Sequence, residues 1–523
     1  MSMIKETIEN IKNNREIKEN LFLMRDELRQ MQSPEKNGEE DEVWLSRNKQ
    51  DEERVLEMRK ELEQLFFHED PKVRRCVAQI LSCVKSQESL DAIYRAYREE
   101  ETLFIREDYL KALAQLDYKS LIPELKQRLD ELLDMEMPEE HRGHLMSETD
   151  ILFEMLTANN ALAKHKFTGL TGVKEILLTT KEGLQDVTIK QLPKVPRKKV
   201  PGGVMVKTDD LDALFEIRTY EELLFYMGIS HEQKEEPEAL AKEIFELGVA
   251  GFLKNSHEQS GPMGVRIGLS DPMERSKKGA YVKRIGQELT RLSKGKLINT
   301  TSGYEAEIRL IPNSEGGHRV MVKLFTLPRH RFDYRKEAVA SSIKPYLAAT
   351  LLKLAGGYLK TGAQVLDPYC GVGTMLIERR AVTTTGDCYG VDSFGEAIQK
   401  ARTNSEKIGP YIHYIQRDFE DFTHSYLFDE IITDMPVATR NVGRQEIRRC
   451  YELLFKKGKE LLKEGGIMVV YGNEHGLMKQ QLRQNKEYSL LREYGIEQRL
   501  DTHLYVIGYR TSQGKKNGNE VTK

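Results

Sequence analysis

The sequence of 523 residues predicts an α/β fold in its C-terminal part, preceded by an α+β region and an all-α N-terminal region. Three observations support this prediction. From about residue 364 onward, short apolar runs alternate with helix-like segments. Between about residues 174 and 328, strand and helix patterns alternate less regularly. The first 160 residues or so are polar, charged and helix-favouring, which predicts helices alone.

The C-terminal pattern predicts a doubly wound sheet of parallel strands. The candidate strands are short, apolar and uniform, as strands buried on both faces are: "QVLD", "CYGVD", "HYIQRD", "EIITD" and "IMVVYG". Helices are expected between them over residues 374–381, 394–407 and 445–463. The last two strands, "YSLLREYGIEQRL" and "HLYVIGYR", are joined too closely for a crossover helix. We therefore expect them to form an antiparallel pair at one edge of the sheet.

The middle region predicts mixed elements. "KEILLTTKEGLQDVTIKQL" indicates a strand, a glycine turn and a helix, "KKVPGGVMVKT" a loop and a strand, and "DLDALFEIRTYEELLFYMG" a pair of helices. Further along, the sequence predicts helices over residues 238–252 and 281–292 and strands over residues 265–269, 305–311 and 319–326.

The N-terminal region predicts a helical arm over residues 1–66 that packs on a neighbour. After it, "DPKVRRCVAQILSCV" is echoed at a spacing of 32 by "LFIREDYLKALAQLD". Such an echo is typical of short HEAT-like repeats, which we expect over residues 67–165. A plain helical bundle is the alternative. In either case these helices are candidates for binding a protein partner.

Composition limits the class of protein. The net charge is −3, so nucleic-acid binding requires a local patch. We expect no membrane span, because no run of about 18 apolar residues is present. The N-terminus has no secretory pattern, so a cytoplasmic location is expected. We expect neither disulfides nor a metal site, because no CxxC pair is formed by the five cysteines: Cys76, Cys83, Cys370, Cys388 and Cys450.

A glycine turn follows the first C-terminal strand in "VLDPYCGVGTMLIERR". Asp367, Gly371 and Gly373 fall at the carboxyl end of that strand, where open α/β sheets bind ligands. Leu376 stands where a dinucleotide fingerprint has its third glycine, and the Lys of a P-loop is absent. The turn therefore suits a nucleoside with a charged amino-acid tail better than a pyrophosphate.

The next two strands also end in acids. Asp392 comes 21 residues after Gly371, where an acid typically accepts the ribose hydroxyls. Asp418 is followed by Phe419, and this pair can bind the adenine amino group and cover one ring face. Each acid alone is better explained as a helix N-cap or a loop acid. Three acids on consecutive strand ends predict S-adenosylmethionine as cofactor.

The fourth strand ends in "IITDMPVATR". An exocyclic amine on a nucleobase is a poor nucleophile, because its lone pair is delocalised into the ring. A carboxylate can accept a hydrogen bond from the N–H group and hold the nitrogen in line with the methyl group. We therefore predict Asp434 as the catalytic acceptor, assisted by carbonyl groups in the turn that Pro436 stiffens. A simple exit from strand to loop is the alternative.

A basic patch precedes the sheet. Residues 261–345 hold 17 Lys or Arg and 8 Asp or Glu, an excess of 17 − 8 = +9. Phe332 and Tyr334 lie among its second cluster and can stack on unpaired bases. A solvated charged face is the alternative. The two clusters predicted to bind RNA are Arg275, Lys277, Lys278, Lys283 and Arg284, and Arg329, Arg331, Arg335 and Lys336.

These segments resemble the THUMP-domain RNA methyltransferases over roughly residues 174–511. "DPYCGVGT" is similar to that family's first motif, and "RHRFDYRKEAVASSIKPYLAATLLKLA" to its linker and lead-in helix. The resemblance implies a Rossmann-like class I methyltransferase sheet with a last antiparallel pair. The implied parts are a ferredoxin-like domain (174–232), a THUMP-like RNA-binding domain (233–328), a linker with lead-in helix (329–360) and the methyltransferase domain (361–511). The polar, Gly-bearing composition of residues 512–523 predicts a disordered tail.

The branch that the sequence resembles most is the tRNA guanine-N2 methyltransferases. The resemblance implies that the cofactor is bound by Asp367, Cys370, Gly371, Gly373, Thr374, Asp392, Asp418 and Phe419, with Ser342, Ile343 and Pro345 closing over it. Val437 departs from the family, which has an aromatic residue there to stack on the target base. Methylation of adenine N6 or of ribosomal RNA, and an inactive RNA-binding scaffold, are the alternatives.

Overall fold

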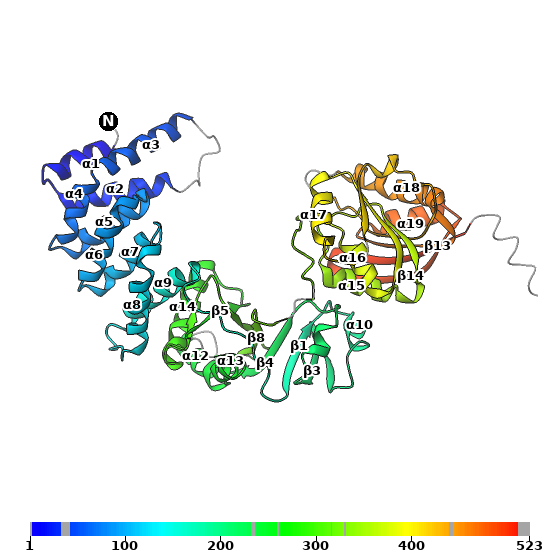
Figure 1. Ribbon diagram of the computed structural model, residues 1–523, viewed down its shortest axis with the longest axis horizontal. Coiled ribbons are helices and arrows are strands. Elements are labelled where there is room, and N and C mark those ends of the chain that lie inside the picture. The colour runs from blue at the N-terminus through cyan, green and yellow to red at the C-terminus, as the bar shows by residue number, and fades with distance from the viewer. Residues whose placement is uncertain are drawn as a thin grey trace, which may run out of the picture. The chain divides into compact units, whose positions relative to one another are not determined.

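The computed structural model describes residues 3–32, 42–231, 236–258, 261–314, 316–328, 331–409, 411–438 and 443–510, with side chains from residue 48 in the second range. The chain divides into two compact units (Figure 1). The first comprises Met1–Gly169 and Met227–Thr326, and the second Leu170–Tyr226 and Leu327–Lys523. Arg329 and the predicted tail over 512–523 lie outside the described residues.

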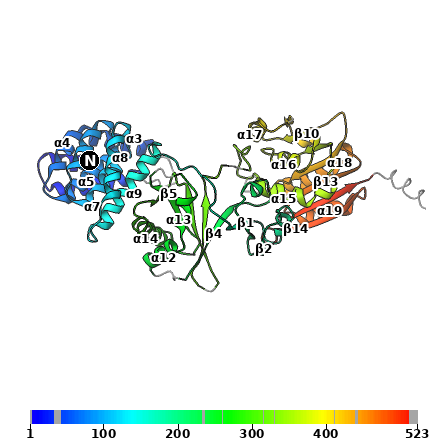
Figure 2. The ribbon, with the colours of Figure 1, turned by 60° about the horizontal axis from the view of Figure 1, so that its bottom comes forward.

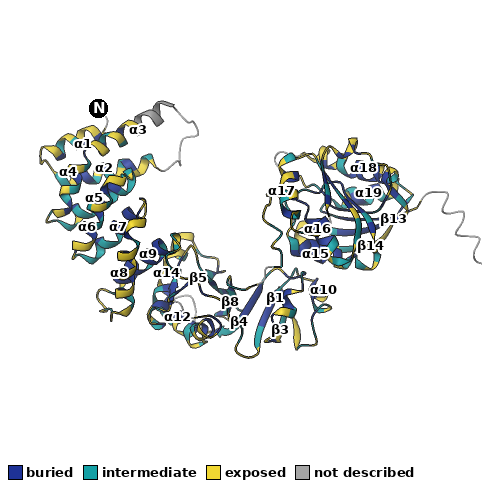
Figure 3. Cartoon of the chain, viewed as in Figure 1, coloured by how far each residue is buried: buried dark blue, intermediate teal, exposed yellow. Residues whose placement is uncertain are grey.

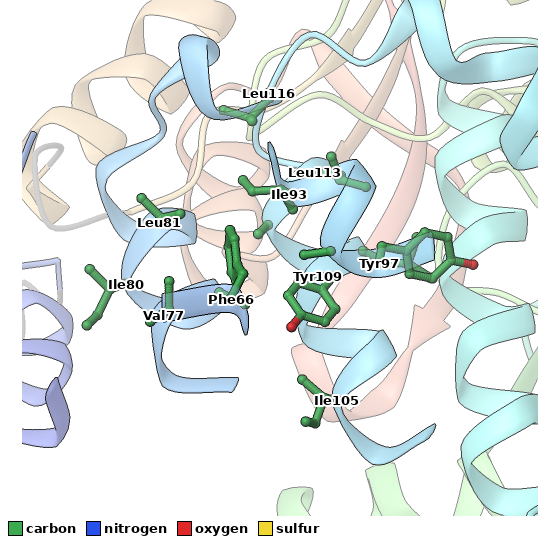
Figure 4. Packing of buried hydrophobic residues seen from close by; sticks show 14 of the residues in the cluster. Phe66, Val77, Ile80, Leu81, Ile93, Tyr97, Ile105, Tyr109, Leu113 and Leu116 are labelled. Atoms are coloured by element: carbon green, nitrogen blue, oxygen red, sulfur yellow. The ribbon is translucent and has the colours of Figure 1, made fainter. Parts of the chain in front are cut away.

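The N-terminal region of the first unit is helical, as predicted. Its α-helices are α1 (Met3–Lys12), α2 (Ile17–Met31), α3 (Glu42–Glu57), α4 (Arg59–Gln64), α5 (Pro71–Val84), α6 (Leu90–Glu99), α7 (Leu103–Leu113), α8 (Ile122–Asp134) and α9 (Arg142–Ala158). The Asp70 side chain caps α5 by accepting the Lys72 N–H, with Pro71 in the first helical position. Side chains from successive helices, among them Phe66, Val77 and Tyr109, share one core (Figure 4).

The rest of the first unit is α+β. Its helices are α12 (Pro237–Glu246), α13 (Val249–Asn255) and α14 (Arg275–Leu292), and its strands are β5 (Met263–Leu269), β6 (Leu297–Asn299), β7 (Ala306–Pro312) and β8 (His318–Leu324). The predicted helix over 238–252 is two helices, because Gly248 adopts φ +81° and begins a new one. The N-terminal helices pack directly on this region: Thr301 Oγ1 donates to Glu154 Oε1 at 2.9 Å.

The second unit begins with a β-α-β-β-α-β segment. It contains β1 (Lys174–Thr179), α10 (Gln185–Ile189), β2 (Arg197–Val200), β3 (Gly203–Thr208), α11 (Asp212–Phe215) and the first half of β4 (Leu223–Ser230), in the strand order β2-β3-β1-β4. The second half of β4, from Met227, belongs to the first unit. The predicted helix pair is wrong in its second half. The apolar run that begins at Leu223 pairs antiparallel with β1 and forms β4. The predicted loop before β3 is also wrong, since it contains β2.

The C-terminal sheet has the order β11-β10-β9-β12-β13-β15-β14. Its strands are β9 (Ala363–Asp367), β10 (Thr385–Asp392), β11 (Ile412–Gln416), β12 (Phe428–Asp434), β13 (Leu462–Gly472), β14 (Tyr488–Glu497) and β15 (Thr502–Tyr509). The first five are parallel, and β15 is antiparallel to both of its neighbours, as predicted. This order makes the sheet Rossmann-like, with its switch point between β9 and β12.

Helices cover both faces of this sheet (Figure 2). The helices are α15 (Pro345–Leu354), α16 (Thr374–Val382), α17 (Gly395–Ser405), α18 (Arg444–Leu461) and α19 (His475–Gln484). Side chains of α15, α16 and α17 share one core with the sheet, and side chains of α18 and α19 share the other. The central strands are accordingly buried (Figure 3). Among the described residues, no helix is both long and apolar enough to cross a membrane.

Candidate active site

A cavity of about 350 Å³ opens in the second unit at the carboxyl ends of β9, β10 and β12. It collects eleven of the residues that the sequence predicted: Ser342, Ile343, Asp367, Cys370, Gly371, Thr374, Asp392, Asp418, Phe419, Asp434 and Pro436. Among the described residues, Gly373 and Pro345 do not line this cavity. Residues from four strand ends therefore converge on one cavity.

Asp367 ends β9 and is buried. Its Oδ1 accepts the backbone N–H of Tyr369 at 3.2 Å. Burial raises the pKa of this carboxyl to about 8, and the nearby Asp434 carboxylate acts in the same direction. The first acid of the motif therefore holds the turn in place while it borders the cavity.

The glycine turn depends on two left-handed residues. Gly371 has φ +50°, and a Cβ added there would meet nothing within 4 Å, so the backbone faces open space. Gly373 has φ +81°, and a Cβ there would lie 2.2 Å from the Tyr414 hydroxyl. Gly373 also precedes the first residue of α16. It therefore shapes the turn from behind, whereas Gly371 borders the cavity.

Asp392 ties the second strand end to the turn. Its Oδ2 accepts the Gly371 N–H at 2.9 Å, and its Oδ1 accepts the Phe394 N–H at 2.8 Å. Each carboxylate oxygen can accept a second hydrogen bond, so the side chain can still receive ligand hydroxyls. The same two hydrogen bonds also fit the alternative interpretation of the sequence, in which this carboxylate is a loop acid.

Asp418 and Phe419 lie just beyond β11, which ends at Gln416. Asp418 Oδ1 accepts the Glu420 N–H at 2.9 Å and caps the short 3-10 helix Phe419–Asp421, so the N-cap alternative describes this carboxylate as well. The Phe419 ring is buried, with its centroid 5.7 Å from that of Tyr369 at an angle of 69°. Both side chains border the cavity.

Asp434 differs from the other acids. It ends β12 and is half-buried, and burial raises its pKa to about 7. Within the described residues, no hydrogen bond reaches its carboxylate, so both oxygens are available to a ligand. The Met435 N–H donates to the Tyr471 carbonyl at 2.8 Å, which fixes the backbone before Pro436. Val437 is 38% exposed beside it.

The linker arginines have internal partners. The Arg331 guanidinium donates to the carbonyls of Ile217, Tyr220 and Glu221. Arg335 donates to Thr374 Oγ1, beside the glycine turn, and to the Ile343 carbonyl. Because these groups hold the linker, we omit both arginines from the RNA surface. Lys336 is exposed, with an ion pair of 3.8 Å to Glu406.

The other basic cluster lies at the start of α14 in the first unit. Arg275, Lys277, Lys283 and Arg284 are exposed, and Lys278 is half-buried. Arg284 forms a two-bond ion pair with Glu238. The remaining pairs are long or involve neutral partners, such as Lys283 Nζ to Ser147 Oγ at 3.1 Å. The cluster therefore keeps exposed positive charge.

Several residues that line the cavity were not predicted from the sequence. Phe394 is 53% exposed at the cavity, two residues after Asp392. An apolar residue directly after a strand-end acid was a usable signal for it. Glu446, Arg449 and Cys450 reach the cavity from α18. No sequence signal marks them, because their position depends on how α18 lies over β12.

Parts of the chain are similar to known methyltransferases. Residues 332–495 match a family model described as "RMKL-like, methyltransferase domain". The chain is 27% identical over 129 residues to tRNA (guanine(10)-N2)-dimethyltransferase of Methanothermobacter thermautotrophicus, covering 24% of this chain and 37% of that protein. It is 26% identical over 209 residues to ribosomal RNA large subunit methyltransferase K/L of Saccharophagus degradans, covering 30% of this chain and 28% of that protein. The chain thus spans between about a quarter and two fifths of the length of these relatives.

Similar solved structures include TrmN from Thermus thermophilus, with 20% identity and a TM-score of 0.49 over 64% of this chain and 99% of that one. A predicted N6-adenine-specific DNA methylase from Listeria monocytogenes has 16% identity and a TM-score of 0.46 over 64% and 96% of the two chains. The family match covers the described sheet from its linker to β14. Residues 332–495 therefore form a methyltransferase domain.

Proposed function

We propose that this protein is an S-adenosylmethionine-dependent RNA methyltransferase that methylates the exocyclic N2 of a guanine in tRNA. One observation carries the proposal. The free acceptor Asp434 shares a cavity with the glycine turn and with the acids that end the neighbouring strands. The family match of residues 332–495 supports the reaction class.

The cavity residues fit this cofactor. Gly371 leaves space where any other side chain would project, and Asp392 keeps acceptor capacity for ribose hydroxyls. We assign the adenine to Asp418 and Phe419, and the amino-acid tail to the turn at Asp367. Ser342 and Ile343 border the same cavity. When bound, the sulfonium group supplies an electrophilic methyl group.

Asp434 would act on the base. Its ionised carboxylate accepts a hydrogen bond from the exocyclic N–H, which returns electron density to the nitrogen and orients its lone pair. The Pro436 turn keeps the adjacent backbone carbonyls in place as further acceptors. A half-buried carboxylate with a pKa of about 7 can also take up the proton released after transfer. Reaching this pocket requires the base to leave its stack.

The choice of guanine N2 in tRNA rests on the sequence resemblance and on the activity named for the Methanothermobacter relative. Ribosomal RNA is the second candidate, because the other relative is a ribosomal RNA methyltransferase. Val437 favours a third reading, an inactive scaffold, since it offers no aromatic ring for stacking. The intact set of cavity acids supports an active enzyme instead.

We assign RNA binding to the exposed α14 cluster and to Lys336. Phosphate contacts of this kind release counterions, so affinity should fall steeply with salt.

Nucleoside analysis tests the proposal. The full chain is incubated with S-adenosylmethionine carrying an isotope-labelled methyl group and with total RNA from cells lacking the gene, and the digested nucleosides are analysed by mass spectrometry. The proposal predicts labelled N2-methylguanosine in the tRNA fraction. Label in N6-methyladenosine or only in ribosomal RNA contradicts the substrate. Cofactor binding without label in any RNA contradicts the activity.

A further inference from the structure

Three side chains converge beyond the proposed active site, where α19, β14 and β15 meet. His475 begins α19, Glu493 lies on β14, and His503 lies on β15. The strand pairing brings them together, since Glu493 pairs with Tyr505 and Gly495 with His503. One atom from each of the three lies within 4.8 Å of the others. We propose that His475, Glu493 and His503 form a binding site for a divalent transition-metal cation, with zinc as the ion best suited to it.

Two of the three distances between the proposed ligand atoms match a tetrahedral metal site. His475 Nδ1 lies 3.5 Å and His503 Nδ1 lies 3.4 Å from the same oxygen, Glu493 Oε1. Ligand atoms about 2.1 Å from a tetrahedral zinc lie about 3.4 Å apart. Two imidazoles and one carboxylate are a ligand set that zinc takes readily, with water in the fourth position.

The hydrogen bonds around His503 leave a lone pair facing the site. His503 Nε2 lies 3.1 Å from Asp501 Oδ1, so the N–H is held on this side of the ring. His503 Nδ1 is buried and has no hydrogen-bond partner among the described residues. In the neutral ring this nitrogen and Glu493 Oε1 are both acceptors, and acceptors at 3.4 Å repel each other unless a cation lies between them. A carboxylate on the far nitrogen is also the partner that metal-bound histidines commonly have.

Two neighbours compete with the metal. The Tyr505 hydroxyl lies 2.9 Å from His475 Nδ1, within hydrogen-bond distance of the atom that would bind the metal. The Lys479 ammonium group pairs with Glu493 Oε2, which leaves Oε1 for the metal but adds a positive charge nearby. Because both neighbours oppose binding, removing either one should strengthen it. A cluster held together only by these hydrogen bonds would instead be loosened.

The site lies at the same edge of the sheet as Asp434. In the strand register Tyr471 pairs with Asp434, and Gly472 pairs with His503. A cation there would connect the first turn of α19 to both strands of the antiparallel pair. It serves no step of the proposed methyl transfer, so its test is independent of that activity.

Metal titration of the full chain tests the site. Protein dialysed against a chelator is titrated with Zn²⁺ in competition with a chromophoric chelator, and with Co²⁺, whose visible absorption reports tetrahedral coordination. We expect one equivalent of bound Zn²⁺. His475→Ala, Glu493→Gln and His503→Ala should each lower the affinity at least about tenfold, and Asp501→Ala about tenfold. His144→Ala, an exposed histidine elsewhere, is the matched control and should change nothing.

Variants of the two competing neighbours should change the affinity in the opposite direction. Lys479→Met and Tyr505→Phe should bind Zn²⁺ several-fold more tightly than the unaltered chain. These variants keep the test valid if a ligand variant fails to fold, which circular dichroism would show. Absence of a bound equivalent, or equal affinity in His503→Ala, overturns the site. Binding that persists in all three ligand variants places the metal at other residues and also overturns the site.

Discussion

Asp434 has a carboxyl pKa raised by burial to about 7, and its proposed role requires the ionised form. The rate of methyl transfer should therefore rise as pH increases through about 7, with the midpoint moved lower when the sulfonium cation is bound nearby. Asp434→Asn keeps an acceptor oxygen but does not titrate, so its slower rate should lack this rise. Initial rates between about pH 5.5 and 9 check this. The same rising limb in Asp434→Asn would assign the titration to another group.

Asp367 gives a stability prediction with a definite sign. Its folded-state pKa of about 8 lies above the ordinary value of 3.8, so the folded chain retains a proton that the unfolded chain releases. Stability is therefore lost as pH rises from about 4 to about 8. Asp367→Asn keeps the acceptor for Tyr369 and removes the charge. It should be more stable than the unaltered chain at about pH 8.5, by at least about 1.4 kcal/mol, and equal to it below about pH 4. Urea unfolding at both pH values checks this, and a less stable variant at pH 8.5 would contradict it.

At the scale of elements, Gly371 and Gly373 have different roles in the turn between β9 and α16. Gly373→Ala should destabilise the domain by about 1–3 kcal/mol from its left-handed backbone alone, with an added clash against Tyr414. Tyr414→Phe in the same chain should recover part of that loss. The added methyl group of Gly371→Ala meets no atom within 4 Å. This variant should therefore lower the free energy of unfolding by less, about 1 kcal/mol.

Cofactor titration completes this comparison. Gly371→Ala should bind S-adenosylmethionine more weakly, because its methyl group enters the cavity, while its melting temperature stays close to that of the unaltered chain. Equal losses of stability in the two glycine variants would contradict the assignment.

The elements also show what sequence could predict. Apolar runs that end in aspartate gave the strand ends and most of the cavity, because buried parallel strands expose their carboxyl ends at one edge. The run from Glu221 to Gly228 was read as helix, since nothing local shows that β1 lies beside it. Arg331 and Arg335 were read as phosphate-binding because a sequence displays charge and not the carbonyls that occupy it. The His475, Glu493 and His503 cluster was missed because only strand pairing assembles it.

At the scale of the whole molecule, an ion pair joins the first part of the second unit to its methyltransferase domain. Arg218 donates two hydrogen bonds to Glu378, which is fully buried and also accepts from Tyr334. Arg218→Ala leaves that carboxylate without its counterion and should cost about 3–5 kcal/mol. Lys344→Ala breaks the exposed pair with Glu221 and should cost under about 1 kcal/mol. Calorimetric melting compares the two, and equal effects would contradict a structural role for the buried pair.

The proposed RNA-binding surface is tested on the whole chain. Replacing Lys277, Lys278 and Lys283 with Gln should weaken tRNA binding and lower the slope of log affinity against log salt by up to about 2.7. Fluorescence anisotropy at several salt concentrations measures both quantities. Lys198→Gln and Lys199→Gln, in the exposed strand β2, serve as the matched control. An unchanged slope in the α14 variant would contradict the assignment.

We propose that one cavity binds S-adenosylmethionine and presents its methyl group to a base held by Asp434. The most direct test measures cofactor affinity and methyl transfer to tRNA side by side for the unaltered chain and for Asp434→Ala. For Asp434→Ala we expect a cofactor affinity within about threefold of that of the unaltered chain. Methyl transfer should fall at least about a hundredfold, as happens when a group that acts only on the transition state is removed. Equal transfer by the two proteins would contradict it.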